Sequence, residues 1–163
     1  MKRAMLDALN DQLNREYYAS YLYLAMAAFF EEKGYVGFAK WMVDQVDEER
    51  EHMMKIYRFI FDRGGHVDLR DIKAPKFKGK DTLHVIEDAV KHEKLVSKYI
   101  NELVDLAIKE KDHATHQFLQ WFVAEQVEEE AAFQAIEQKL LIIGDNKAAL
   151  YLIDKELGER HKP

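Results

Sequence analysis

Apolar residues recur at alternating steps of three and four along four long segments of the chain. These segments span approximately residues 5–33, 36–63, 82–110 and 113–143. The spacing places the apolar side chains on one face of an α-helix, whereas a half-buried strand would alternate with period two. The 163 residues include only 7 Gly and 2 Pro, too few turn residues for an all-β fold. The pattern predicts an all-α fold in which long amphipathic helices pack in a single domain, residues 1–163.

The connections between these segments predict the direction of each helix. A few residues around Gly34 join the first two segments, which should therefore form an antiparallel hairpin. Residues 66–81 are too long and too irregular for a tight turn and can cross the length of a bundle. A short joint at 111–113 returns the fourth segment antiparallel to the third, and a short fifth helix is expected at 147–157. The prediction is a four-helix bundle with one long crossover and a short C-terminal helix.

Each of the four apolar stripes is interrupted near its middle by polar side chains. The interrupting residues are Glu16, Glu49, His52, Glu93, Gln126 and Glu129. The bundle topology brings these positions to the same height. Burying one unpaired carboxylate costs several kcal/mol, whereas a whole domain is stable by roughly 5–15 kcal/mol. Because no Lys or Arg occupies the stripes at this height, either protons or bound cations must neutralise the carboxylates.

The interrupting residues are suited to metal binding. Glu49 and His52 are three residues apart, so both side chains can reach one cation from the same helical face. A carboxylate-rich set with one imidazole suits Fe, Mn or Zn, and two ions bridged by carboxylates fit the number of ligands better than one. Glu125 and Glu128 flank the stripe of the fourth segment and can form a third cation site with Glu48.

Other residues near this polar layer allow more than one interpretation. Tyr23 and Trp121 can serve electron transfer or donate hydrogen bonds to a metal-bound ligand, but such aromatic residues also serve simply as core. Glu130 is expected to face solvent. The remaining histidines have no ligand pattern around them and are expected at the surface: His66, His84, His92, His113, His116 and His161.

Charge and composition exclude several classes of function. The net charge of −6 argues against a nucleic-acid partner, which would require a basic face. The absence of Cys excludes disulfides, thiolate metal sites and cysteine nucleophiles. Polar residues interrupt the first residues of the chain, as a signal peptide would not allow, and no apolar run approaches the ~18 residues needed to cross a bilayer. We therefore expect a cytoplasmic protein with no membrane or nucleic-acid partner.

The motifs around the polar layer resemble those of the ferritins, specifically the non-haem ferritins of bacteria and archaea. The matching stretches cover residues 10–16, 48–52, 91–93, 118–130 and 153–157. The resemblance extends over nearly the whole chain. Gln126 and Glu129 stand where the haem-binding bacterioferritins have a Glu-x-x-His motif, so the chain differs from those proteins. The absence of Cys separates it from rubrerythrins, and the fifth helix separates it from the small Dps cages.

The resemblance implies a di-iron ferroxidase centre inside each subunit. Glu16, Glu49 and His52 would hold the first iron, with Glu49 bridging to a second iron held by Glu93. Gln126 would lie beside the second iron, and Tyr23 and Trp121 match aromatic positions near the centre. A third iron site is implied at Glu48, Glu125, Glu128 and Glu129. The family builds shells of 24 subunits, which oxidise Fe(II) with dioxygen or peroxide and store the iron as mineral.

Two alternatives remain open at this stage. The first is a di-iron or di-manganese redox enzyme on the same bundle, which would act on peroxide or an organic substrate without accumulating a mineral. The second is a structural bundle whose polar layer only specifies the packing. That protein would bind no Fe(II) or Zn(II) stoichiometrically.

Overall fold

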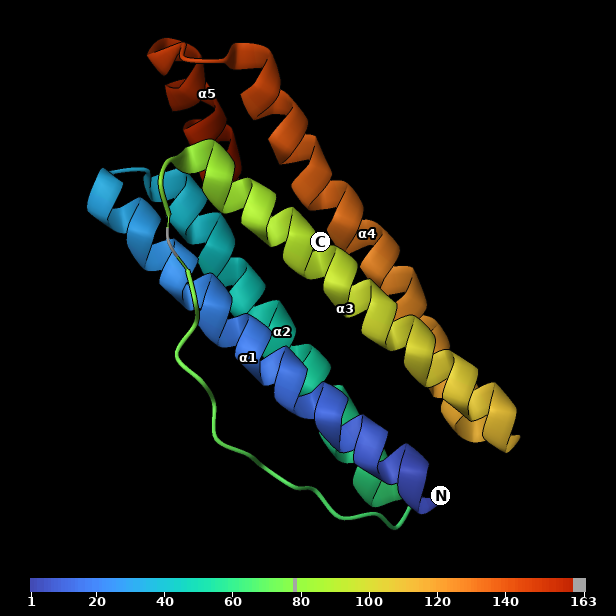
Figure 1. Cartoon of the computed structure of the whole chain (residues 1–163). Coiled ribbons are helices and arrows are strands. Elements are labelled where there is room, and N and C mark those ends of the chain that lie inside the picture. The colour runs from blue at the N-terminus through green and yellow to red at the C-terminus, as the bar shows by residue number, and fades with distance from the viewer. Residues whose placement is uncertain (78, 160–163) are drawn as a thin grey trace.

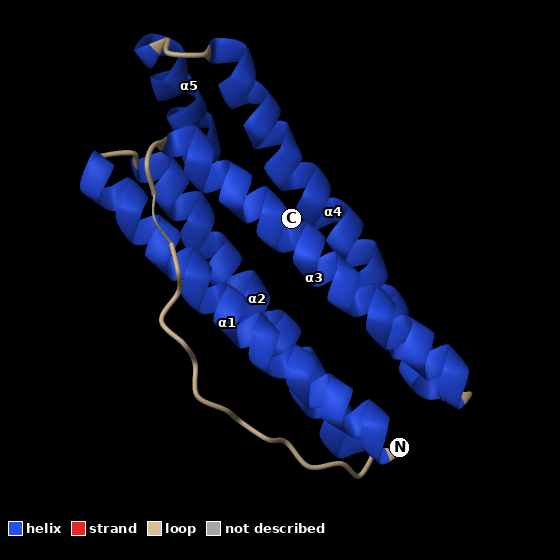
Figure 2. Cartoon of the chain, viewed as in Figure 1, coloured by secondary structure: helices blue, strands red, loops and turns tan. Residues whose placement is uncertain are grey.

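The computed structural model describes residues 1–77 and 79–159, which form five helices and no strand (Figure 1, Figure 2). The helices are α1 (Arg3–Lys33), α2 (Val36–Asp62), α3 (Thr82–Glu110), α4 (His113–Ile143) and α5 (Lys147–Gly158). In Figure 1, α1 and α4 run in one direction while α2 and α3 run in the other. The predicted all-α bundle is confirmed, and the helix bounds differ from the predicted ones only at the ends. Gly158, expected to stop the fifth helix, is its last residue.

The segment between α2 and α3 runs along the outside of the bundle, so that α2 and α3 are parallel (Figure 2). Two asparagines of α1 hold it. The Asn10 side chain donates to the carbonyl oxygen of His66 at 2.9 Å and accepts from the Asp68 amide at 2.7 Å. Asn14 similarly donates to Asp68 and accepts from the Arg70 amide. These side chains satisfy backbone groups that have no helix or sheet partner.

Short local signals end and begin the helices. Gly34 ends α1 with a φ of 78°, a left-handed conformation that glycine adopts without steric cost. Asp81 caps α3 by accepting from the His84 amide at 2.9 Å. The first turn of α2 has no cap of its own. Instead, Asp154 of α5 accepts from the Phe38 amide at 2.9 Å, which ties the fifth helix to the bundle.

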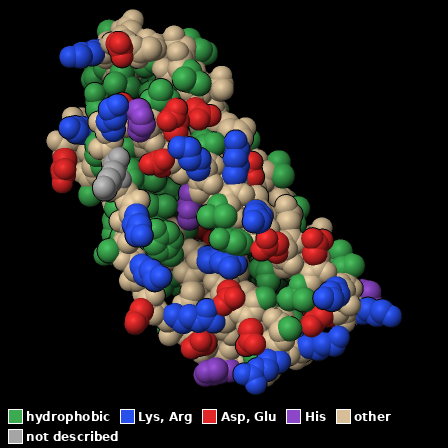
Figure 3. Space-filling model, viewed as in Figure 1, with side chains coloured by type: hydrophobic (Ala, Val, Ile, Leu, Met, Phe, Trp, Pro, Cys, Tyr) green, Lys and Arg blue, Asp and Glu red, His purple; other side chains and the backbone are tan. Residues whose placement is uncertain are grey.

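Two apolar clusters lie on either side of the polar layer. One lies toward α5 and includes Tyr23, Phe38 and Phe133, and the other lies toward the start of α1 and includes Leu13 and Phe122. On the face seen in Figure 3, acidic and basic side chains are intermixed, with apolar side chains between them. None of the described helices contains a stretch long and apolar enough to cross a membrane.

Candidate metal centre

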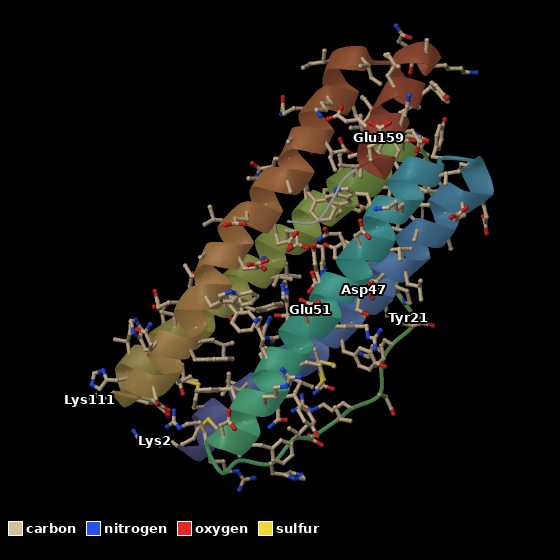
Figure 4. All side chains as sticks on the ribbon, turned by 180° about the vertical axis from the view of Figure 1, so that it is seen from behind. Lys2, Tyr21, Asp47, Glu51, Lys111 and Glu159 are labelled. Carbon is tan, nitrogen blue, oxygen red and sulfur yellow. The ribbon has the colours of Figure 1, made fainter. Side chains whose placement is uncertain are left out.

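All four long helices contribute to one buried polar layer. No residue of this layer exposes more than 5% of its surface. Its members are Glu16, Glu49, His52, Glu93, Gln126 and Glu129. The neighbouring acidic residues Asp47 and Glu51, labelled in Figure 4, are exposed on α2. The period of the helix therefore sends Glu49 inward while Asp47 and Glu51 stay in solvent.

The first group of candidate ligands is Glu16, Glu49 and His52. Each of the three offers a ligand atom within 4.8 Å of the others. His52 Nδ1 lies 3.4 Å from Glu49 Oε2, as expected for residues one helical turn apart. Glu16 reaches the same point from α1. Three ligand atoms at this separation can hold one cation between them.

Glu93 occupies the α3 side of the layer with a donor at each carboxylate oxygen. The Tyr23 hydroxyl donates to Oε1, and Gln126 Nε2 donates to Oε2 at 3.0 Å. Tyr23 is itself fully buried, with its ring stacked on Phe133 at 5.5 Å. The structure therefore brings together Glu93, Gln126 and Tyr23.

A second group of candidate ligands lies on the other side of His52. It consists of His52, Glu125 and Glu129, whose ligand atoms again lie within 4.8 Å of one another. His52 Nε2 faces Glu125 at 3.8 Å, so the imidazole turns one nitrogen toward each group. Glu48 is half-buried, and its charge contributes to the raised pKa of Glu129. Glu128, in contrast, is exposed on α4 and belongs to neither group.

Burial and mutual repulsion oppose ionisation of these carboxyls. Burial raises the pKa of Glu16 and of Glu49 well above the usual range, and the charge of a neighbouring carboxylate raises each further. Burial also raises the pKa of Glu93, and that of Glu129 rises to about 8. Within residues 1–77 and 79–159 no Lys or Arg side chain is buried. Apart from the His52 imidazole, the described residues thus place no basic side chain in this layer.

Buried oxygens without partners fit a bound cation. Glu16 Oε2 and Glu49 Oε2 are both inaccessible to solvent and have no hydrogen-bond partner in the described part of the chain. Such groups are rare in folded proteins unless a ligand or ion completes them. Carboxylate oxygens with one imidazole form a donor set suited to iron, manganese or zinc. A cation would bind the deprotonated carboxylates and release their protons.

Three sequence-based expectations of exposure, those for His92, Glu130 and His116, are wrong. His92 is half-buried rather than at the surface; its ring lies 5.8 Å from that of Tyr23, and burial lowers its pKa to about 4. Glu130 is half-buried rather than solvated and accepts a hydrogen bond from Ser97 of α3. His66, His84 and His113 are exposed as predicted, His116 is half-buried, and His161 lies outside the described residues.

Trp121 lies beside the layer, as expected, but it is not a core residue. It is 39% exposed, and its ring lies edge-on to that of His52 at 5.4 Å. On α2, Lys55 Nζ lies over the Trp121 ring, 4.3 Å from its centre. Trp121 therefore separates His52 from solvent.

Two buried glutamines adjoin the layer and were not recognised from the sequence as part of the site. Gln12 Nε2 donates to Glu16 Oε1 at 2.7 Å, and Gln45 Nε2 donates to Glu129 Oε2 at 2.8 Å. Gln45 lies one helical turn before Glu49 on the same stripe, and this position could have identified it.

Comparison with known proteins supports the same interpretation as this geometry. A model of the ferritin-like domain family matches residues 6–142. The chain belongs to the ferritin family. A bacterial non-heme ferritin of Staphylococcus aureus (strain MRSA252) is 44% identical over 160 residues, covering 98% of this ferritin and 96% of the relative. Membership of this family supports a role in iron storage.

Solved ferritin structures share the fold over the full length. An open-pore ferritin from the hyperthermophilic archaeon Archaeoglobus fulgidus is 46% identical, with a TM-score of 0.97 and 99% of both chains covered. A humanized archaeal ferritin is 48% identical, with a TM-score of 0.98 and the same coverage. The resemblance to bacterial and archaeal non-haem ferritins is thereby confirmed.

Proposed function

We propose that this ferritin is an iron-storage ferroxidase. Two Fe(II) ions bind the polar layer as substrate, are oxidised there, and pass as Fe(III) into a mineral held inside a shell of 24 subunits. The observation that carries this proposal is that the buried Oε2 atoms of Glu16 and Glu49, beside His52, lack hydrogen-bond partners, while no Lys or Arg is buried within residues 1–77 and 79–159. A protein that only packed helices together would have little reason to retain so costly an arrangement.

The roles proposed for the individual side chains are those that the resemblance to the ferritins implies, and the grouping of Glu16, Glu49 and His52 supports the first of them. Glu16, Glu49 and His52 hold one ion, and Glu49 also reaches a second ion held by Glu93. Gln126 and Glu129 adjoin the second ion from α4. Tyr23 donates to Glu93 and so fixes the direction of that carboxylate. Because anionic oxygen ligands favour the harder Fe(III) over Fe(II), the layer makes oxidation easier.

The electrons and protons of the proposed reaction balance. Each Fe(II) gives up one electron. Dioxygen accepts two electrons and two protons and leaves as hydrogen peroxide; hydrogen peroxide, when it is the oxidant, accepts two electrons and two protons and gives two water molecules. The raised pKa values of Glu16 and Glu49 favour their protonated forms, and a cation that binds these carboxylates displaces the protons, which the reaction can use.

A third iron site is proposed at Glu48, Glu125, Glu128 and Glu129. The grouping of Glu125 and Glu129 with His52 supports it, whereas the exposed position of Glu128 gives that residue the weakest support. Membership of the ferritin family supports self-association, and we extend it to the 24-subunit shell. We further propose one domain over residues 1–163 and a cytoplasmic location.

The direct test measures Fe(II) oxidation by stopped-flow absorbance in Glu16→Ala and His52→Ala. We expect the fast phase to slow by at least about tenfold, since each change removes a ligand rather than a supporting group. Glu102→Ala, on an exposed position of α3, is the matched control and should oxidise iron normally. Rapid oxidation in both ligand variants would refute the proposed site.

Two further measurements separate the alternatives. A redox enzyme on the same bundle would turn over without a mineral, so iron loading followed by sedimentation should give a dense iron-filled particle only if the protein stores iron. A structural bundle would bind no metal in a fixed ratio. Zn(II) titration of the apo-protein by calorimetry should therefore saturate at a defined number of ions per chain, and the absence of saturable binding would favour the structural bundle.

A further inference from the structure

Three buried glutamines each donate an amide N–H to a different carboxylate of the layer. Gln12 donates to Glu16, Gln45 to Glu129 and Gln126 to Glu93, at 2.7, 2.8 and 3.0 Å respectively. Neither Gln12 nor Gln45 has any exposed surface. A glutamine amide is neutral, so it can donate to a carboxylate without adding a positive charge that would repel a metal cation.

The direction of the Gln12 amide is set by a neighbour. Its oxygen accepts from Arg15 Nη1 at 3.4 Å, and the Arg15 guanidinium lies 3.7 Å from the centre of the Tyr99 ring of α3. Because the guanidinium can only donate, the Gln12 oxygen must face Arg15 and its nitrogen must face Glu16. Gln45 reaches from α2 to Glu129 on α4, so its hydrogen bond also ties two helices together at the layer.

Because of these hydrogen bonds, some carboxylate oxygens of the layer accept from an amide and others do not. Oε1 of Glu16 accepts from Gln12, while Oε2 of the same carboxylate has no hydrogen-bond partner. Oε2 of Glu129 accepts from Gln45, and one oxygen of the same carboxylate lies within 4.8 Å of ligand atoms of His52 and Glu125. No glutamine of the described chain donates to Glu49. An amide that donates to one oxygen occupies one of that oxygen's lone pairs and fixes the carboxylate, which favours ligation of a cation through the other oxygen, whereas Glu49 receives no amide.

We propose that Gln12 and Gln45 are positioning residues that restrict Glu16 and Glu129 to ligation through one oxygen. Glu49 is then the carboxylate free to bridge two ions, because it receives no amide. Restricting the other carboxylates lowers the number of protein ligands on each ion and leaves room for the oxidant. This inference rests on the proposed ferroxidase function and concerns how the same site is shaped.

The test uses redox-inert metals beside iron. Gln12→Leu and Gln45→Leu remove the amide, and Gln12→Met also removes it while keeping an unbranched side chain of similar length. Gln134→Leu, at a half-buried position on α4, is the matched control. Zn(II) affinity is measured by calorimetry, Co(II) coordination by visible absorption, and the KM and kcat of Fe(II) oxidation by stopped-flow.

We expect Zn(II) affinity to fall about 10- to 100-fold in the three amide variants, as is typical when a partner of a metal ligand is removed. The KM for Fe(II) should rise with it. The Co(II) absorption should weaken, because a carboxylate released from its amide binds through both oxygens and raises the coordination number. A glutamine that only fills space would alter thermal stability without changing the Co(II) spectrum.

Unchanged Co(II) spectra and Zn(II) affinities in the amide variants would overturn the inference. If a leucine variant fails to fold, Gln12→Met gives the same comparison with a side chain of similar length and shape. Glu16→Ala, measured in parallel, distinguishes failure of the positioning role from failure of the ferroxidase site. Loss of metal binding in Glu16→Ala with normal binding in the glutamine variants refutes only the positioning role, whereas normal binding in Glu16→Ala refutes the ferroxidase site itself.

Discussion

The Tyr23 hydroxyl donates a hydrogen bond to Oε1 of Glu93, connecting α1 with α3 inside the polar layer. The tyrosine ring is stacked on Phe133 and meets His92 edge-on, so packing on both sides holds the hydroxyl in place. Burial and the nearby charge of Glu93 raise the pKa of Tyr23 well above its usual value. The hydroxyl therefore keeps its proton and remains a donor to Glu93 throughout the physiological range.

Removing this donor should affect both stability and iron oxidation. Tyr23→Phe keeps the ring and its stacking but leaves Glu93 Oε1 without its partner. Losing one partner of a buried hydrogen bond costs about 1–3 kcal/mol, so the apo-protein should unfold at a lower temperature. Fe(II) oxidation should also slow, because Glu93 is no longer fixed in direction. Tyr17→Phe, on the exposed face of α1, should change neither measurement. Unaltered melting and oxidation in Tyr23→Phe would show that the hydrogen bond has no role.

The stability of the apo-protein should fall as pH rises from 6.5 to 8. The pKa of Glu129 is about 8 in the folded chain against 4.5 as the ordinary value, and the pKa values of Glu16, Glu49 and Glu93 are also raised. The folded state therefore binds more protons than the unfolded state above pH 4.5, and this stabilisation is lost as pH rises through the folded pKa. The effect is on the order of a few kcal/mol.

His92 determines the window in which this measurement is clear. Its pKa falls from 6.5 to about 4 on folding, so between these values it makes stability rise with pH and opposes the carboxyls. Above pH 6.5 only the carboxyl effect remains. Thermal unfolding with a chelator present should show a falling midpoint over this window, while saturating Zn(II) should abolish or reverse the fall. A rising midpoint in the metal-free protein would contradict the raised pKa values.

The sequence was most informative where a charge interrupts an apolar stripe. Glu16, Glu49 and Glu93 could be located because a carboxylate on a core line is costly and therefore conspicuous. Gln12 and Gln45 occupy buried positions too, yet they were missed because an uncharged amide can be buried at much lower cost. Gln12 and Gln45 differ from other buried polar residues in that each amide donates to a carboxylate of the layer. Such a hydrogen bond depends on the directions of the side chains, which sequence spacing alone does not specify.

The wrong predictions for His92 and Glu130 have a common physical cause. Each residue lies beside the stripe of its own helix, so periodicity assigned it to solvent. Neighbouring helices cover both side chains: Tyr18 and Tyr23 of α1 contact His92, and Ser97 of α3 donates to Glu130. Burial contributed by another helix cannot be inferred from the pattern of a single segment.

The crossover should loosen when its side-chain contacts to α1 are removed. Asn10→Ala deletes the hydrogen bonds to His66 and Asp68, and the double variant with Asn14→Ala also frees Arg70. Hydrogen exchange should accelerate at the amides of Asp68 and Arg70 while the amides of α2 stay protected. Fe(II) oxidation should be retained, since the polar layer does not depend on this segment. Unchanged exchange at both amides would show that other contacts hold the crossover.

Gly37→Ala should dislodge α5 without disturbing the polar layer. A Cβ at this position would lie 1.6 Å from the carbonyl oxygen of Asp154, so only glycine lets α5 approach the start of α2 so closely. The hydrogen bond from the Phe38 amide to Asp154 would be lost with it. Overpacking of this kind costs about 1–3 kcal/mol, which should lower the melting temperature and raise hydrogen exchange across residues 147–158.

Val36→Ala, at a site 62% exposed, is the control and should leave both the melting temperature and the hydrogen exchange unchanged. Because the layer lies about midway along the helices, Zn(II) binding should persist in Gly37→Ala; its loss would mean that the fifth helix supports the metal centre directly.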